Sequence, residues 1–187
     1  LSRNDVIESV WLPKATSVGE ETFSGCRQLA HVSLPVIESI GFSAFAGCQR
    51  LRSVSLDAQI LGEDAFAFCS SLRTVSLPYA RFASVSLFNC CFHLELVSMP
   101  IATEVRACSF SECSSLTEVS LPAVRHVGSF AFLSCNKLEA VSFPRLESVH
   151  RSAFFRCRRL SEERIAAPEH VEITLPSSSS LAYPEGT

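Results

Sequence analysis

The sequence predicts an α/β repeat fold, a solenoid of stacked coils with a parallel β-sheet along one side. Two observations carry this prediction. Phe lies three residues before, and Leu three residues after, each cysteine of a regular ladder, as Phe23 and Leu29 do around the first one. The ladder recurs every 22 residues, with one interval of 21, at Cys26, Cys48, Cys69, Cys91, Cys113, Cys135 and Cys157. A fixed period of roughly 20–29 residues is typical of such stacked repeats.

The strand of each coil follows its ladder cysteine. The segment reads Leu-x-x-Val-Ser-Leu-Pro, most clearly over residues 29–35. Apolar Val and Leu alternate with Ser, which is the two-residue period of a half-buried strand. Pro then ends the strand in most coils. Stacking places these strands in parallel, about 4.8 Å apart.

The segment before each cysteine predicts a short helical turn on the opposite side of the coil. Phe and Cys are three residues apart there, which suits one turn of helix. Acidic residues such as Glu20 often begin the segment and basic residues such as Arg27 often follow it, an order that suits the helix dipole. We expect Phe to fill the wide side of the core and Cys to act as a small apolar filler.

The full motif, Leu-x-x-Val-Ser-Leu-Pro followed by Ile-Gly-x-x-Ala-Phe-x-x-Cys, resembles the BspA-like leucine-rich repeats. It is clearest over residues 29–48, and the resemblance covers roughly residues 6–166. The resemblance implies a right-handed solenoid used for adhesion or protein contact, often on cell surfaces. Ser84 and Arg106 replace the glycine of the other coils, so we expect those two turns to differ.

The chain divides into three parts. Residues 1–166 form the solenoid, of seven to eight coils, with its first strand over residues 7–13. Its last coil departs from the motif, because Glu163 and Arg164 fall where Val and Ser are expected. Residues 167–176 are the candidate capping strand, and residues 177–187, rich in Ser, Pro and Gly, are expected to be flexible. No capping segment precedes the first strand, so we expect an upstream coil, a partner or a second copy to cover the N-terminal edge.

Composition favours a globular protein over a membrane or nucleic-acid binder. Of 187 residues, 47% are hydrophobic and 19% charged, with a net charge of −3. No apolar run reaches the roughly 18 residues that span a bilayer, and the start lacks a signal-peptide pattern. We read the one basic cluster as a solvated face, with an anionic partner as the alternative; it comprises Arg151, Arg156, Arg158, Arg159 and Arg164. The compartment stays open: the resemblance implies a cell-surface or secreted protein, and free thiols suit the cytosol.

The residues that carry chemistry do not converge in the sequence. A zinc site needs about four ligands around one point, whereas a ladder spreads its sulfurs along a line, so buried free thiols are favoured over disulfides or metal. Cys90 and Cys108 lie outside the ladder and are expected to face outward, as two incidental thiols or as a redox or metal pair. No two of the five histidines share a repeat position, and no phosphate loop is present. We therefore expect no enzymatic activity and no cofactor.

The outer face of the strands is the candidate binding surface, since solenoids use this side for partners. Its central line is almost uniformly Ser, while the two positions before each Val vary. Arg52 and Arg73, followed by Glu95 and Glu139, suggest a positive and a negative half, with simple solubilisation as the alternative. The candidate contacts are Trp11, His31, Arg52, Arg73, Glu95, Leu96 and Glu118.

The sequence thus predicts a non-catalytic module that binds a protein partner or mediates adhesion through its strand face. The alternative is a structural subunit or fragment of a larger assembly, held by its uncapped N-terminal edge. The exposed position of Trp11 suits either reading, because Trp is enriched in contact surfaces.

Overall fold

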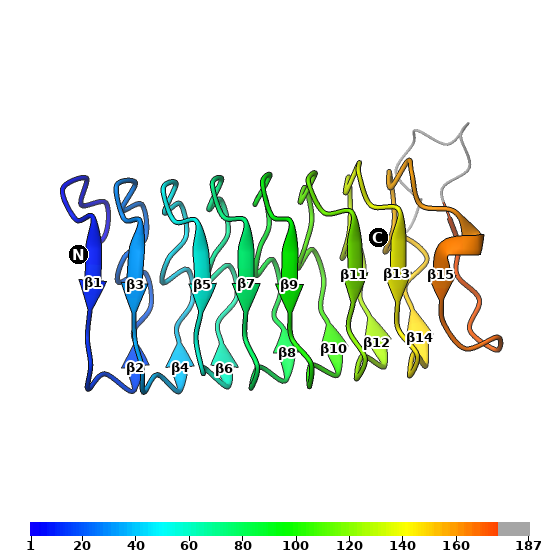
Figure 1. The fold of residues 1–187 in the computed structure, drawn as a ribbon, viewed down its shortest axis with the longest axis horizontal. Helices are drawn as coiled ribbons and strands as arrows, with labels where there is room; N and C mark the ends of the chain where they lie inside the picture. Colours follow the sequence, from blue (N-terminus) through cyan, green and yellow to red (C-terminus); the bar gives the residue numbers. More distant parts are fainter. Residues whose placement is uncertain (176–187) are drawn as a thin grey trace.

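The computed structural model describes residues 1–175, whose coils stack along one axis (Figure 1). Each coil contributes one long and one short strand. The long strands are β1 (Ser9–Trp11), β3 (His31–Ser33), β5 (Ser53–Ser55), β7 (Thr74–Ser76), β9 (Leu96–Ser98), β11 (Glu118–Ser120), β13 (Ala140–Ser142) and β15 (Ile165–Ala166). The short strands are β2 (Ser17–Val18), β4 (Ser39–Ile40), β6 (Ile60–Leu61), β8 (Phe82–Ala83), β10 (Glu104–Val105), β12 (His126–Val127) and β14 (Ser148–Val149).

All strand pairs are parallel, and each joins equivalent residues of neighbouring coils. Val10 pairs with Val32, for example, and Val105 with Val127. We call the outer surface of the long strands the long-strand face and that of the short strands the short-strand face. The first is interrupted between β3 and β5 and between β9 and β11, and the second between β6 and β8. The predicted parallel solenoid is confirmed; its handedness stays a prediction.

The third side of each coil is built of turns, so the expected short helices are wrong. Within residues 1–175 the only helix is a 3₁₀ turn, η1 (Glu162–Arg164). In the first full coil, Glu21 and Gly25 have positive φ angles of 50° and 70°, which a helix does not allow. The Phe23 N–H donates to Ala44 O of the next coil at 2.8 Å. The Ser24 N–H, by contrast, donates within the turn to Glu21 O at 3.1 Å. The turn therefore alternates bonds along the solenoid axis with bonds across three residues of its own chain.

The core is a column of phenylalanines beside a column of cysteines. The rings of Phe23, Phe45 and Phe66 stack with centroids 5.3 and 5.4 Å apart, and the stack continues to Phe154. Each ladder thiol also donates to the carbonyl of the Phe position one coil earlier, as Cys48 Sγ does to Phe23 O at 3.3 Å. The cysteines therefore fill space, as predicted, and also satisfy a buried acceptor.

The repeat extends slightly beyond β1 at the N-terminal end. Leu1 O accepts from Cys26 Sγ, and the Arg3 N–H donates to Ser24 O at 2.6 Å. Asn4 stands where a ladder cysteine would, and its Oδ1 accepts from the N–H groups of Val6 and Ile7. Residues 1–4 thus form the end of a further turn that packs on the first full coil.

The C-terminal end differs from the expected capping strand. This coil is two residues longer and contains η1, so Ile165, and not Glu163, takes the Val position opposite Val141. No strand forms over residues 167–175. This segment instead packs Val171, Ile173 and Leu175 against the end of the core, half-buried. Residue 176 and the tail expected to be flexible, 177–187, lie outside the described residues.

Candidate functional site

The residues predicted as contacts share one exposed surface, the long-strand face. Trp11, His31, Leu96 and Glu118 lie in the strands themselves, and Arg52, Arg73 and Glu95 each directly precede one. His31, Leu96 and Glu118 occupy the same repeat position, so they form a row in which each coil adds about 4.8 Å. Trp11 is 73% exposed and in register with Ser33, and Leu96 is 66% exposed.

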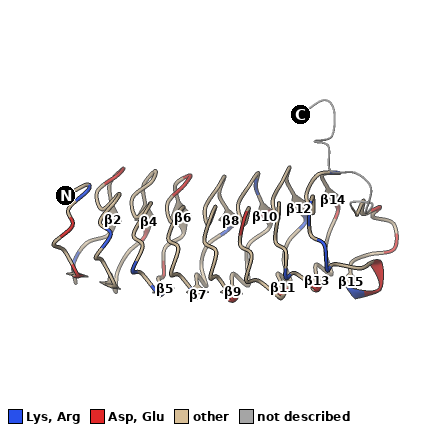
Figure 2. Ribbon diagram, turned by 90° about the horizontal axis from the view of Figure 1, so that it is seen from above, with Lys and Arg blue, Asp and Glu red and all other residues tan. Residues whose placement is uncertain are grey.

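Several charges of this face are paired across coils, so the expected positive and negative halves are joined at Arg73 and Glu95. Arg73 Nη1 lies 2.5 Å from Glu95 Oε1 on the next coil. Glu139 accepts a hydrogen bond from Arg159 Nη1 at 3.2 Å and forms an ion pair with Arg164 Nη1 at 3.8 Å. Figure 2 shows acidic and basic residues interspersed along the coils. Exposed pairs like these add little stability, about 0–1 kcal/mol each.

The short-strand face is more varied and carries a groove at its interruption between β6 and β8. The groove has a volume of about 480 Å³. Phe82 and Ile60 provide its apolar surface, and Ile60 is 67% exposed. The Arg106 guanidinium lies over the Phe82 ring, 4.5 Å from its centroid, and Arg106 Nε donates to Glu104 Oε2 at 3.1 Å. Its lining comprises Gln59, Ile60, Leu61, Arg81, Phe82, Ser84 and Arg106.

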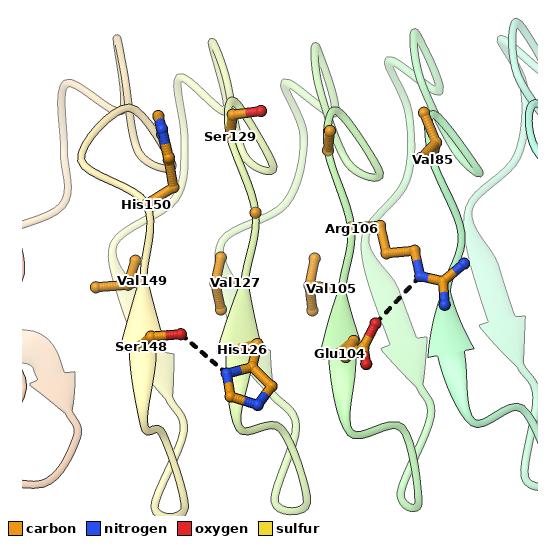
Figure 3. Close-up of a pocket in the computed structure, with 12 residues that line it drawn as sticks. Val85, Glu104, Val105, Arg106, His126, Val127, Ser129, Ser148, Val149 and His150 are labelled. Carbon is orange, nitrogen blue, oxygen red and sulfur yellow. Dashed lines mark hydrogen bonds and ion pairs between the residues drawn. The ribbon is translucent and has the colours of Figure 1, made fainter. Parts of the chain in front are cut away.

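A second groove, of about 640 Å³, continues from Arg106 across β10, β12 and β14 (Figure 3). Val105, Val127 and Val149 lie side by side beneath it, and Val105 and Val127 are buried in the core. His126 and His150 also line this groove, with Nδ1 atoms 2.9 Å from Ser148 Oγ and 2.8 Å from Ser152 Oγ. Each of the two histidines thus contacts a serine of its neighbourhood.

Sequence reasoning missed these groove residues because it compared only identical repeat positions. His126 and His150 differ by one coil plus two residues, and residues two apart on extended chain face the same side. The sequence did contain a signal for these groove residues, at the first position of each short strand. That position is Ser at both ends of the solenoid but Ile60, Phe82, Glu104 and His126 in the middle coils.

The replaced glycines account for part of the groove. A Cβ on Gly62 would lie 2.4 Å from Phe42 N, so that coil approaches its neighbour closely. Where Ser84 stands instead, its Oγ donates to Leu61 O at 2.5 Å, and the short-strand sheet is interrupted there. The following turn keeps its usual bond, from the Ser86 N–H to Ala107 O, so the change expected at Ser84 stays local.

Cys90 and Cys108 lie on the turn side, half-buried, both with positive φ angles. Burial raises the pKa of both thiols, and nearby Glu112 adds to the effect at Cys90 and Asp64 at Cys108. All nine cysteines are free thiols. Within residues 1–175, no group of three or more His, Cys, Asp or Glu side chains is arranged to hold a metal ion. The same residues contain no helix with the length and hydrophobicity needed to span a bilayer.

A family model for the BspA-type leucine-rich repeat region matches residues 3–105 and 83–178, in six copies. The chain belongs to this family. Members are repeat proteins, typically protein-interaction or surface modules and generally non-enzymatic. The BspA-type resemblance drawn from the motif is thereby confirmed. No curated protein gives a significant match.

Solved structures similar to this BspA-type chain are bacterial leucine-rich repeat proteins. One from Eubacterium ventriosum is 19% identical with a TM-score of 0.69, covering 89% of this chain and 46% of its own. One from T. pallidum is 25% identical with a TM-score of 0.52, covering 84% and 79%. One from Bacteroides ovatus is 20% identical with a TM-score of 0.50, covering 91% and 63%. The chain thus spans about half to two thirds of the Eubacterium and Bacteroides proteins, and the likeness to them concerns the fold.

Proposed function

We propose that this chain is a non-catalytic module that binds a protein partner, or mediates adhesion, through its long-strand face. The observation that carries the proposal is the row of varied side chains at one repeat position on a face otherwise lined by Ser. Trp11 and Leu96 supply exposed apolar area on it, and Trp is enriched among the few residues that carry most of the binding energy of an interface. Membership in a family of interaction modules supports the same proposal.

Site-specific photo-crosslinking in cells that express the chain tests the proposal. A crosslinker at Leu96 should capture a protein, whereas one at Phe68, exposed on the turn side, should not. The double variant R52E/R73E should abolish the Leu96 product, because it reverses two charges beside the row. The matched control K14E/R145E makes the same charge change at exposed positions off this face. Capture mainly from Phe68, or no effect of R52E/R73E, would overturn the proposal.

A second candidate function, assembly through the N-terminal edge, is favoured by the exposure of Leu1, Val6, Trp11 and Leu12 around the first coil. Light scattering across concentration tests it. Association that Trp11→Ser abolishes, and that Leu96→Ser leaves unchanged, would support this edge as the contact. A monomer at every concentration would rule out self-association and leave the long-strand face as the place to look for a partner.

A further inference from the structure

We propose that the short-strand face carries a second binding site, for an extended segment of a partner protein that presents a carboxylate beside an apolar side chain. The site lies in the coils whose short strands do not begin with the usual Ser. Ser17, Ser39 and Ser148 begin the short strands near the ends, while Ile60, Phe82, Glu104 and His126 begin those between. Departures from local pattern that bring no gain in packing concentrate at functional sites.

The groove between β6 and β8 combines apolar surface with positive charge. Ile60 and Phe82 offer aliphatic and aromatic contact, and Arg81 and Arg106 line the same groove. Its lining contains no acidic residue. An occupant that places an anionic group beside an apolar side chain is therefore complementary to it.

Arg106 is the group that would bind the carboxylate. Its guanidinium is fixed by the Phe82 ring below it and by the bond from Nε to Glu104. Among residues 1–175, its two terminal nitrogens have no hydrogen-bond acceptor, so both remain for a ligand. A guanidinium held in this way suits bidentate recognition of a carboxylate, since little side-chain freedom is left to lose.

The shape of the surface favours a polypeptide over a small molecule. The two grooves share Arg106 and together run from β6 to β14. Four coil steps correspond to about 19 Å, the length of roughly six residues of extended chain. Beyond Arg106 the lining continues along β12 and β14, where the exposed His126 and Ser148 begin the strands. This site lies on a different face from the proposed long-strand surface and does not depend on it.

Selection from a displayed library of random peptides of about 12 residues, somewhat longer than the face spans, tests the proposal. We expect enrichment of Asp or Glu beside Leu, Ile or Phe. The selected peptides should bind Arg106→Gln at least about tenfold more weakly, the loss of one charged bidentate contact. Arg125→Gln is the matched control, because Arg125 is exposed on the same face, pairs with Glu147 and lines neither groove.

Three results would overturn the proposal: no enriched sequence, enrichment without acidic residues, or equal loss of affinity in both variants. Displacement of the peptides by sodium acetate as effectively as by unlabelled peptide would also overturn it, because a free anion would then suffice. The R52E/R73E variant should bind the selected peptides as tightly as the original chain does. This result separates the test from that of the long-strand face. Thermal unfolding of each variant verifies that the fold is retained.

Discussion

At the scale of single residues, the recurrent Phe-x-x-Cys motif has two physical causes. The Phe rings stack along the axis, and each thiol meets the carbonyl of the Phe position one coil earlier. The first cause follows from the spacing of apolar residues. The second could not be predicted, because the thiol and its acceptor lie 24 or 25 residues apart and meet only once the coils are stacked.

Cys91 and Cys90 allow this role to be tested with one substitution at adjacent positions. Cys91→Ala removes a fully buried thiol and its 3.2 Å bond to Phe66 O, so it should destabilise the fold by about 1–2 kcal/mol. Cys90→Ala removes a half-buried thiol outside the core and should cost less than about 0.5 kcal/mol. Urea unfolding at neutral pH measures both. Equal losses would mean that the ladder position has no special role.

Thiol labelling distinguishes the same two classes without mutation. Cys90 and Cys108 should react in the folded protein, and the seven ladder thiols, at most 2% exposed, should not. Because the pKa of both reactive thiols is raised, little thiolate is present at neutral pH, and labelling should accelerate as the pH rises. Mass spectrometry of the folded and the urea-unfolded chain counts the labels. Labelling of ladder thiols under native conditions would contradict the closed core.

At the scale of elements, the strands were predictable and the turns were not. Alternating Val, Ser and Leu marks the long strands directly, and the ladder period sets their parallel register. The turns use positive φ angles at residues such as Glu21, Ser43 and Asp64, which give no glycine signal. The three-residue spacing of Phe and Cys is shared by a helix and by these turns, so sequence alone favoured the wrong one.

The close approach between neighbouring coils at Gly62 predicts how the stability of the fold responds to a glycine substitution. A methyl group on Gly62 would lie 2.4 Å from Phe42 N, whereas on Gly19 its nearest neighbour is Thr22 Oγ1 at 3.5 Å. Gly62→Ala should therefore destabilise the fold by about 1–3 kcal/mol through overpacking against backbone. Gly19→Ala, at the same repeat position, should be nearly neutral. Thermal unfolding of the two variants side by side measures the difference, and similar melting temperatures would contradict the close approach.

At the scale of the whole molecule, the candidate surfaces were predictable only in part. The long-strand residues follow from the strand pattern, because alternation assigns their side chains to the outside. Ser84 and Arg106 stood out as exceptions in the sequence, but the interruption between β6 and β8 that accompanies them did not. The stacking of Arg106 on Phe82 joins residues 24 positions apart, and such a contact exists only in the assembled stack.

The thiol ladder also makes the stability of the whole solenoid depend on pH. Burial raises the pKa of Cys26, Cys91, Cys113 and Cys135, and contact with the Cys69 thiol, together with burial, raises that of Cys48. The folded state therefore keeps protons that the unfolded chain releases above its ordinary thiol pKa of about 8.5. Stability is fully present below that pH and is lost as the pH rises, by about 1.4 kcal/mol per pH unit for each such thiol.

Urea unfolding between about pH 8 and pH 10, under reducing conditions, measures this dependence. The midpoint should fall steeply across that range. A variant with Cys48, Cys91 and Cys135 replaced by Ala should be less stable at neutral pH, because buried contacts are lost. Its midpoint should nevertheless fall more gradually, since three groups that ionise only on unfolding are gone. Lower stability at neutral pH combined with a shallower pH dependence is specific to the loss of buried thiols. Surface charges, which both proteins share, contribute equally to the two profiles. Parallel pH profiles for the two proteins would contradict a proton-retaining ladder.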